Sequence, residues 1–169
     1  LGKMAQCHLK LLQPAEALTI YNELLLMEPD NNKIIASAGT CYLNLGDYEK
    51  ALECFFRIEF NSPGEANAIR PLAWSLFLLN RNEEAAVYYG QLLGMDPNEF
   101  DFMNAGHVAW CQGKRLEAAS HYKNSIRKRN GDLKTFLRAF ASDKPFLLKN
   151  GLSEREIQMM LDFISLNLK

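Results

Sequence analysis

The sequence predicts an all-α fold: a right-handed α-α superhelix, or solenoid, of four stacked helix pairs closed by a C-terminal helical cap. Two observations predict it. Several residue types recur at intervals of 34 along the chain, and this pattern gives way after residue 130 to two further amphipathic segments. A fixed period of this length indicates repeats that each bury an apolar face against the next. We therefore expect repeats at about 1–30, 31–64, 65–98 and 99–130, and capping helices over 131–169.

Four columns of residues share the 34-residue period: Pro29, Pro63 and Pro97; Ala17, Ala51 and Ala85; Tyr21, Phe55 and Tyr89; Leu24, Ile58 and Leu92. A small alanine suits a point where two helices cross closely. The aromatic residue four positions later lies on the same helix face and fills the groove beside a neighbouring helix. The proline ends the second helix of each pair, because it lacks an amide proton.

This pattern resembles the tetratricopeptide repeat family, in which W-x2-L-G-x2-Y is followed by A-x3-F and then P. The second unit has Gly39, Tyr42, Ala51, Phe55 and Pro63 in these places, with Ile and Ala where the family has Trp and Leu. A more divergent fourth unit, offset by one residue, continues the pattern in the residues Gly106, Gly113, Ala118 and Tyr122. The resemblance implies a scaffold that binds a peptide or protein partner, and it implies no catalysis.

The first expected helix covers the start to residue 12, and after a turn at Gln13-Pro14 the next continues to Glu28. The other expected helices cover 31–45, 48–61, 65–80, 82–95, 99–112 and 114–129. Asp132 should cap a helix that carries Leu133, Phe136, Leu137 and Phe140. Pro145 should open a short turn after it. Ser153 and Glu156 form a capping box before a helix with the stripe Ile157, Met160, Leu161, Ile164 and Leu168. Because only the C-terminal end is capped, we expect this chain to be the C-terminal part of a longer protein.

The resemblance places the partner on the concave surface, which the first helix of each repeat lines. Helical spacing selects the inward-pointing residues Lys33, Ser37, Thr40, Asn44, Asn67, Arg70, Trp74, Phe77, Phe100, Met103, Asn104, His107 and Trp110. Two interpretations stay open. The aromatic members form a groove for an apolar segment of a partner, or the C-terminal cap folds back and buries them.

One subclass of partner is not predicted. Repeats that clamp the terminal carboxylate of heat-shock proteins need several Lys and Asn residues, whereas the matching positions here hold Gly2, Gln6, Ser37, Arg70 and Trp74. A single arginine does not make such a clamp. The repeat count also resembles the small chaperones of type III secretion, but the distinct C-terminal cap sets this chain apart.

A basic stretch lies between Lys114 and Arg138, with eight basic and two acidic residues. Its triplet Arg127, Lys128 and Arg129 is a candidate patch for an anionic partner, either an acidic protein or RNA. The alternative is a solvated helix end whose cations complement the helix dipole. Few aromatic residues interleave with the charges, so nucleic acid is the weaker of the two partners.

Other function classes find little support. The net charge is −1, and no apolar run approaches the roughly 20 residues that span a membrane. The four cysteines have no metal-binding spacing, and His107 with Cys111 would supply two ligands where a structural zinc takes four. We therefore predict no enzyme, no metal, no cofactor and a cytoplasmic location. The leading function is a protein-interaction scaffold; the alternative is a structural dimerisation or anchoring domain of a larger regulator or enzyme, which leaves a homodimer open.

Overall fold

The computed structural model describes residues 13–166, and the chain divides into two compact units, Leu1–Leu79 and Asn80–Lys169. Every element in the described range is a helix, which confirms the predicted all-α fold. The expected first helix, with Cys7 and the positions Gly2 and Gln6, lies outside the described residues, as does Leu168.

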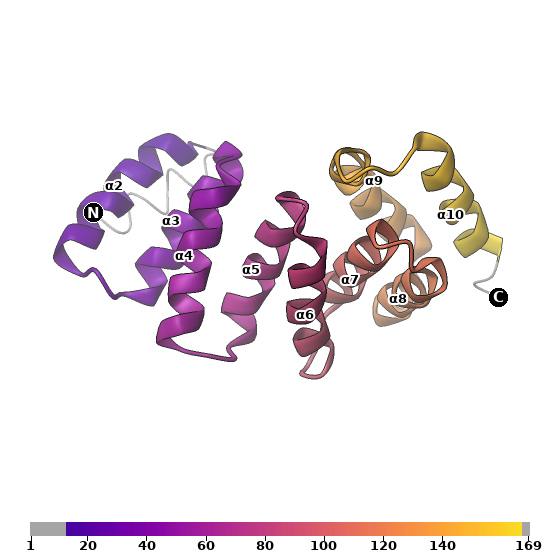
Figure 1. Cartoon of the computed structure of the whole chain (residues 1–169), viewed down its shortest axis with the longest axis horizontal. Helices are drawn as coiled ribbons and strands as arrows, with labels where there is room; N and C mark the ends of the chain where they lie inside the picture. The colour runs from indigo at the N-terminus through magenta and orange to yellow at the C-terminus, as the bar shows by residue number, and fades with distance from the viewer. Residues whose placement is uncertain (1–12, 167–169) are drawn as a thin grey trace. The chain divides into compact units, whose positions relative to one another are not determined.

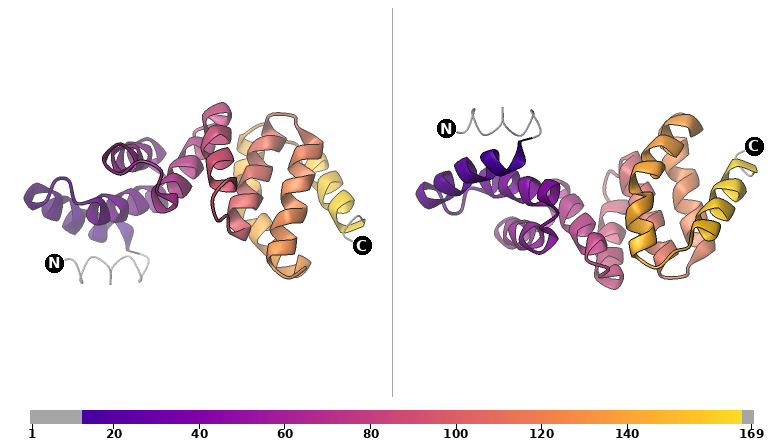
Figure 2. Two further views of the ribbon diagram at one scale, coloured as in Figure 1. Left: turned by 90° about the horizontal axis from the view of Figure 1, so that it is seen from below. Right: turned by 90° about the horizontal axis from the view of Figure 1, so that it is seen from above.

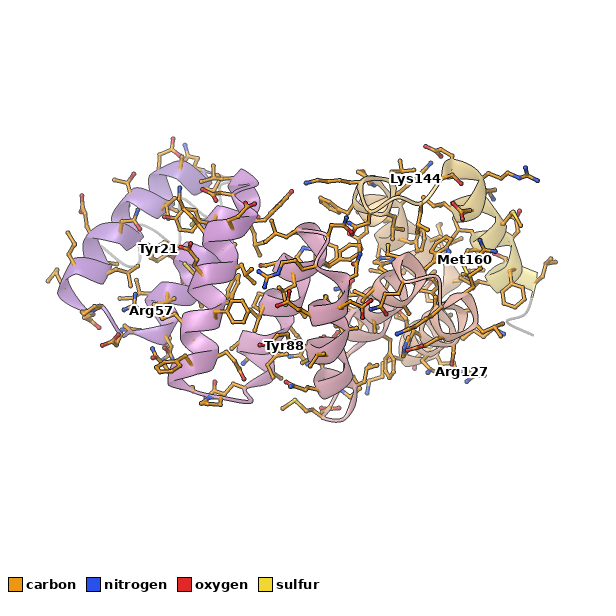
Figure 3. All side chains as sticks on the ribbon, viewed as in Figure 1. Tyr21, Arg57, Tyr88, Arg127, Lys144 and Met160 are labelled. Atoms are coloured by element: carbon orange, nitrogen blue, oxygen red, sulfur yellow. The ribbon has the colours of Figure 1, made fainter. Side chains whose placement is uncertain are left out.

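The first unit contains α2 (Pro14–Met27), α3 (Asn32–Leu45), α4 (Tyr48–Asn61) and α5 (Ala66–Leu78). Each helix packs on the next in chain order, so that short turns join neighbouring helices (Figure 1). Arg57 on α4 stabilises the turn before α3 (Figure 3). Its guanidinium donates to the carbonyl of Pro29 at 2.5 Å and to the Asp30 carboxylate at 2.9 Å.

The second unit contains α6 (Asn82–Leu93), α7 (Glu99–Cys111), α8 (Arg115–Lys128), α9 (Leu133–Lys149) and α10 (Glu154–Leu166). Helix α6 packs on α7, and α7 packs on α8. Helix α9 contacts both α7 and α8, and α10 contacts α8 and α9 (Figure 2). The two helices after residue 130 therefore cover the last helix pair, as a cap does.

The periodic columns explain why these helices pack. The alanines of the column, with Ala118 of the fourth unit, are fully buried, and the aromatic residues Tyr21, Phe55, Tyr89 and Tyr122 are at most 3% exposed. Cys41 lies in the same core as Ala17 and Tyr21, where a thiol packs as a small apolar side chain. The helices α2 and α4 end two residues before Pro29 and Pro63, in agreement with the role predicted for these prolines.

Two glycines permit the closest approaches between paired helices. A Cβ atom at Gly106 on α7 would lie 2.5 Å from Cε1 of Tyr122 on α8. The equivalent atom at Gly39 on α3 would lie 2.8 Å from Cζ of Phe55 on α4. Each glycine thus makes room for the aromatic ring of its own repeat, which is the physical reason for a glycine at this position.

The prediction for Pro145 is wrong. Helix α9 continues through it from Leu133 to Lys149, where a turn was expected. Phe140 and Leu147, on either side of the proline, are both buried, and seven residues bring them to the same helix face. Packing on both sides of the proline holds the helix together despite the missing backbone hydrogen bond. The predicted caps are confirmed at Asp132, which accepts from the Thr135 amide, and at Ser153 with Glu156.

Candidate functional site

The inner residues of α3 form an exposed polar row. Lys33, Thr40 and Asn44 are exposed, and Ser37 is half-buried. The hydroxyls of Ser37 and Thr40 donate to carbonyl oxygens four residues earlier in the helix, each at 2.9 Å. These hydroxyls keep acceptor capacity for a ligand, and Lys33 supplies the single positive charge of the row.

The corresponding residues of α5 are more buried than those of α3. Asn67 is exposed, whereas Arg70 and Trp74 are half-buried. Phe77 is fully buried, and its ring centroid lies 5.2 Å from that of Trp74. Buried residues occur around much of the circumference of α5, including Ala68, Leu72, Ser75, Leu76 and Leu78, so that Asn67, Arg70 and Trp74 mark its accessible side. Phe77 therefore supports Trp74 from inside and does not itself face a partner.

The inner face of α7 is almost entirely covered. Met103 and Trp110 are 2% exposed and His107 is 0% exposed, whereas Phe100 at the helix start is 46% exposed and Asn104 is half-buried. The structure thus places three of the five candidates of this repeat in the interior. Of the two interpretations of these residues, burial under the C-terminal cap is the one seen for His107 and Trp110.

Phe140 of α9 lies beside both His107 and Trp110. Its ring meets His107 at a centroid distance of 5.2 Å and an interplanar angle of 69°, and it meets Tyr122 of α8 at 5.5 Å and 74°. The Trp110 ring lies 6.5 Å away, and Phe136, one turn earlier on α9, adds a contact at 5.9 Å. Edge-to-face packing of this kind adds to the burial of apolar area, so this aromatic cluster holds α9 on α7.

Hydrogen bonds of His107 accompany the aromatic cluster. The Nδ1 atom of His107 lies 2.8 Å from the hydroxyl of Tyr122, and Nε2 lies 3.4 Å from Oδ2 of Asp143 on α9. Burial raises the pKa of Tyr122, and Cys111 and Asp143 act in the same direction. The hydroxyl therefore keeps its proton at neutral pH and pairs with Nδ1 of His107, while Nε2 faces the Asp143 carboxylate. With its imidazole fully buried, His107 serves to join α7, α8 and α9. Sequence reasoning missed Asp143, because it lies 36 residues from His107.

The basic triplet at the end of α8 is only partly available. Arg127 is exposed, with its side chain on the outside of the unit (Figure 3). The ammonium group of Lys128 lies 3.8 Å from the carboxylate of Asp96. The Arg129 side chain is 10% exposed, because its guanidinium lies 4.5 Å from the centroid of the Phe100 ring and 3.8 Å from the Glu99 carboxylate. Arg129 thus fastens α8 to the start of α7.

The described thiols are poor nucleophiles. Burial raises the pKa of Cys111 to about 12. It also raises the pKa of Cys54 to about 11, and the carboxylate of Glu53 acts in the same direction. Because the thiolate is the reactive form, these raised pKa values favour the less reactive thiol at neutral pH. Between Pro14 and Leu166, no helix combines the length and the apolar character needed to cross a membrane.

Comparison with known proteins agrees with the repeat pattern. A family model described as Tetratricopeptide repeat matches residues 8–73, which include the complete second unit and its Gly39, Ala51, Phe55 and Pro63. Residues 8–73 are thus similar to tetratricopeptide repeats. This confirms the resemblance predicted from the sequence, and the tetratricopeptide repeat fold is consistent with a protein-interaction scaffold.

Solved structures extend the likeness of fold to most of the chain. MamA from Desulfovibrio magneticus RS-1, residues 41 to the end, is 17% identical, with 89% of this chain and 94% of that chain covered and a TM-score of 0.70. TTC0263, a thermophilic tetratricopeptide repeat protein from Thermus thermophilus, is 19% identical, with 82% of this chain and 76% of that chain covered and a TM-score of 0.68. No curated protein matches the chain by sequence. At these identities the likeness shows the fold alone.

Proposed function

We propose that this chain is a protein-interaction scaffold that binds a polypeptide on the inner residues of α3 and α5. The similarity of residues 8–73 to tetratricopeptide repeats supports the class of function. One observation carries the choice of surface. The inner row of α3 is exposed at Lys33, Thr40 and Asn44, whereas the inner residues Met103, His107 and Trp110 of α7 are buried, and of these His107 occupies the place of Thr40.

The chemistry of this row suits an extended polar segment with one apolar anchor. Thr40 and Trp74 are 34 residues apart, as are Lys33 and Asn67, so each pair occupies one position in successive repeats. The amides of Asn44 and Asn67 can bond to the main chain of a peptide that crosses from α3 to α5. The Trp74 ring offers a contact for an apolar side chain, and Lys33 offers one for a carboxylate.

The basic triplet and the accessible residues of α7 are less suited to form the main partner surface. Of the basic triplet, Arg127 and Lys128 stay candidates for an acidic part of the partner, whereas Arg129 is used within the fold. Phe100 and Asn104 are accessible at the start and middle of α7, which belongs to the second unit. The proposal includes no catalytic step, and the cytoplasmic location stays a prediction.

The substitution Thr40→Arg tests the proposed surface. It places a long cation in the middle of the α3 row without disturbing the core, since Thr40 is exposed. We expect the amount of partner captured by the immobilised chain to fall at least about tenfold, which corresponds to the loss of a contact worth about 1.4 kcal/mol. The melting temperature should stay unchanged.

Thr19→Arg is the matched control. Thr19 is also exposed, and its hydroxyl also donates to a carbonyl four residues earlier, at 3.2 Å, but it lies on α2. Partners captured by the unchanged chain and by Thr19→Arg, but lost with Thr40→Arg, would support the proposal. Equal capture by both variants would place the binding surface elsewhere. Trp110 is unsuitable for this test, because its burial means that Trp110→Ala would disturb the fold itself.

A further inference from the structure

The last helix, α10, is apolar on two faces. Ile157, Met160 and Ile164 are buried against the rest of the second unit. A second stripe, formed by Met159, Phe163 and Leu166, is 58%, 42% and 77% exposed respectively. Spacings of four and three residues bring these side chains to one side of the helix. A helix that only caps a repeat needs a single apolar stripe, so the second stripe calls for another explanation.

A groove lies directly beside this stripe. It encloses about 220 Å³ between α8 and α10, and it is lined by Trp110, Arg115, Leu116, Glu156, Met159, Met160 and Phe163. Leu116 on the α8 wall is 83% exposed. Arg115 and Glu156 form an ion pair of 3.3 Å across one end of the groove. An apolar ridge and an apolar groove therefore occupy one face of the second unit, which is the surface character expected of an interface.

The two helices beside the groove carry opposite net charge, and the groove itself is lined by one charged residue of each, Arg115 of α8 and Glu156 of α10. Helix α8 carries the cations Arg115, Lys123, Arg127 and Lys128 against the single acid Glu117. Helix α10 carries the acids Glu154, Glu156 and Asp162 against the single base Arg155. The α8 wall thus favours a helix that is apolar on one side and acidic beside it. Helix α10 has this chemistry, since exposed Asp162 adjoins the stripe of Met159 and Phe163.

We propose that a second copy of this chain covers the groove, with the exposed stripe of α10 of each copy packed over the α8/α10 groove of the other. A two-fold interface requires one surface to be complementary to itself. The face described above meets this requirement, because it presents both ridge and groove and both charges. The residues involved are separate from those of the proposed partner surface on α3 and α5, so the two proposals stand or fall independently.

Sedimentation equilibrium of the chain between about 1 µM and about 1 mM tests the proposal, since a modest interface dissociates within this range. We expect the mass to rise from one chain to two with concentration. Met159→Glu, at an exposed position of the ridge, and Leu116→Glu, at an exposed position of the opposite wall, should each abolish the rise. Circular dichroism should show unchanged helix content for both variants.

Val87→Glu is the control, because Val87 on α6 is 61% exposed and lies outside the groove. It should associate as the unchanged chain does. A mass of one chain throughout the range would overturn the proposal, and so would a dimer that survives both Met159→Glu and Leu116→Glu. Association lost equally with Val87→Glu would assign it to a different surface and would overturn the proposal as well.

Discussion

Gly106→Ala is expected to destabilise the second unit by about 3 kcal/mol, near the upper end of the usual cost of overpacking. The added Cβ would lie 2.5 Å from Cε1 and 2.7 Å from Cδ1 of Tyr122. This ring cannot move aside easily, because it is fully buried and packs against Trp110, Phe136 and Phe140. Either α7 and α8 separate, or the ring displaces α9.

The measurement is urea unfolding followed by the fluorescence of Trp110 in a Trp74→Phe background, in which the remaining tryptophan reports on the second unit. Gly90→Ala is the matched control, since Gly90 is also helical but a Cβ there would meet no atom within 4 Å. That change should stabilise the chain by about 0.5–1 kcal/mol, because alanine is the better helix former. Similar free energies of unfolding for the two variants would show that the close packing at Gly106 is not as described.

Phe140→Ala is expected to cost about 3–5 kcal/mol, the range found when a fully buried phenylalanine is truncated. Phe140 is 1% exposed, and its ring contacts His107, Trp110, Tyr122 and Phe136. These contacts hold α9 to α7 and α8, so the cavity would open at the joint between the cap and the last helix pair. The same unfolding experiment gives the free energy.

Phe60→Ala is the control, because it truncates an exposed phenylalanine instead of a buried one. Phe60 on α4 is 86% exposed, so its truncation should change the free energy of unfolding by no more than about 0.5 kcal/mol. Phe140→Ala should also raise the accessibility of Trp110. Full stability of Phe140→Ala would mean that the cap is held by other contacts.

The sequence predicts the helices well because their signals are local and repeated. The alanine, aromatic and proline columns locate α3 and α4 almost to the residue, and the caps at Asp132 and Ser153 locate α9 and α10. The turn expected at Pro145 is wrong for a physical reason. The tendency of a proline to end a helix is local, whereas the burial of Phe140 and Leu147 depends on α7 and α8.

The candidate surface is less predictable, because spacing shows which face a side chain is on but not what covers that face. Thr40 and His107 occupy the same place in their repeats, yet Thr40 is exposed and His107 has Phe140 and Asp143 of α9 over it. Arg129 looked like part of a surface patch, but its guanidinium lies over the Phe100 ring. The exposed stripe of Met159, Phe163 and Leu166 escaped notice because the neighbouring stripe already explained α10 as a cap.

The central claim is that α9 covers the inner face of α7 and so confines the proposed partner surface to α3 and α5. Acrylamide quenching of two single-tryptophan chains, Trp74→Phe and Trp110→Phe, tests it most directly, because Trp110 is 2% exposed and Trp74 is half-buried. The account predicts that Trp110 is quenched several-fold more slowly than Trp74 and becomes readily quenched when Phe140→Ala is added. Quenching of Trp110 as fast as that of Trp74 in the otherwise unchanged chain would contradict it.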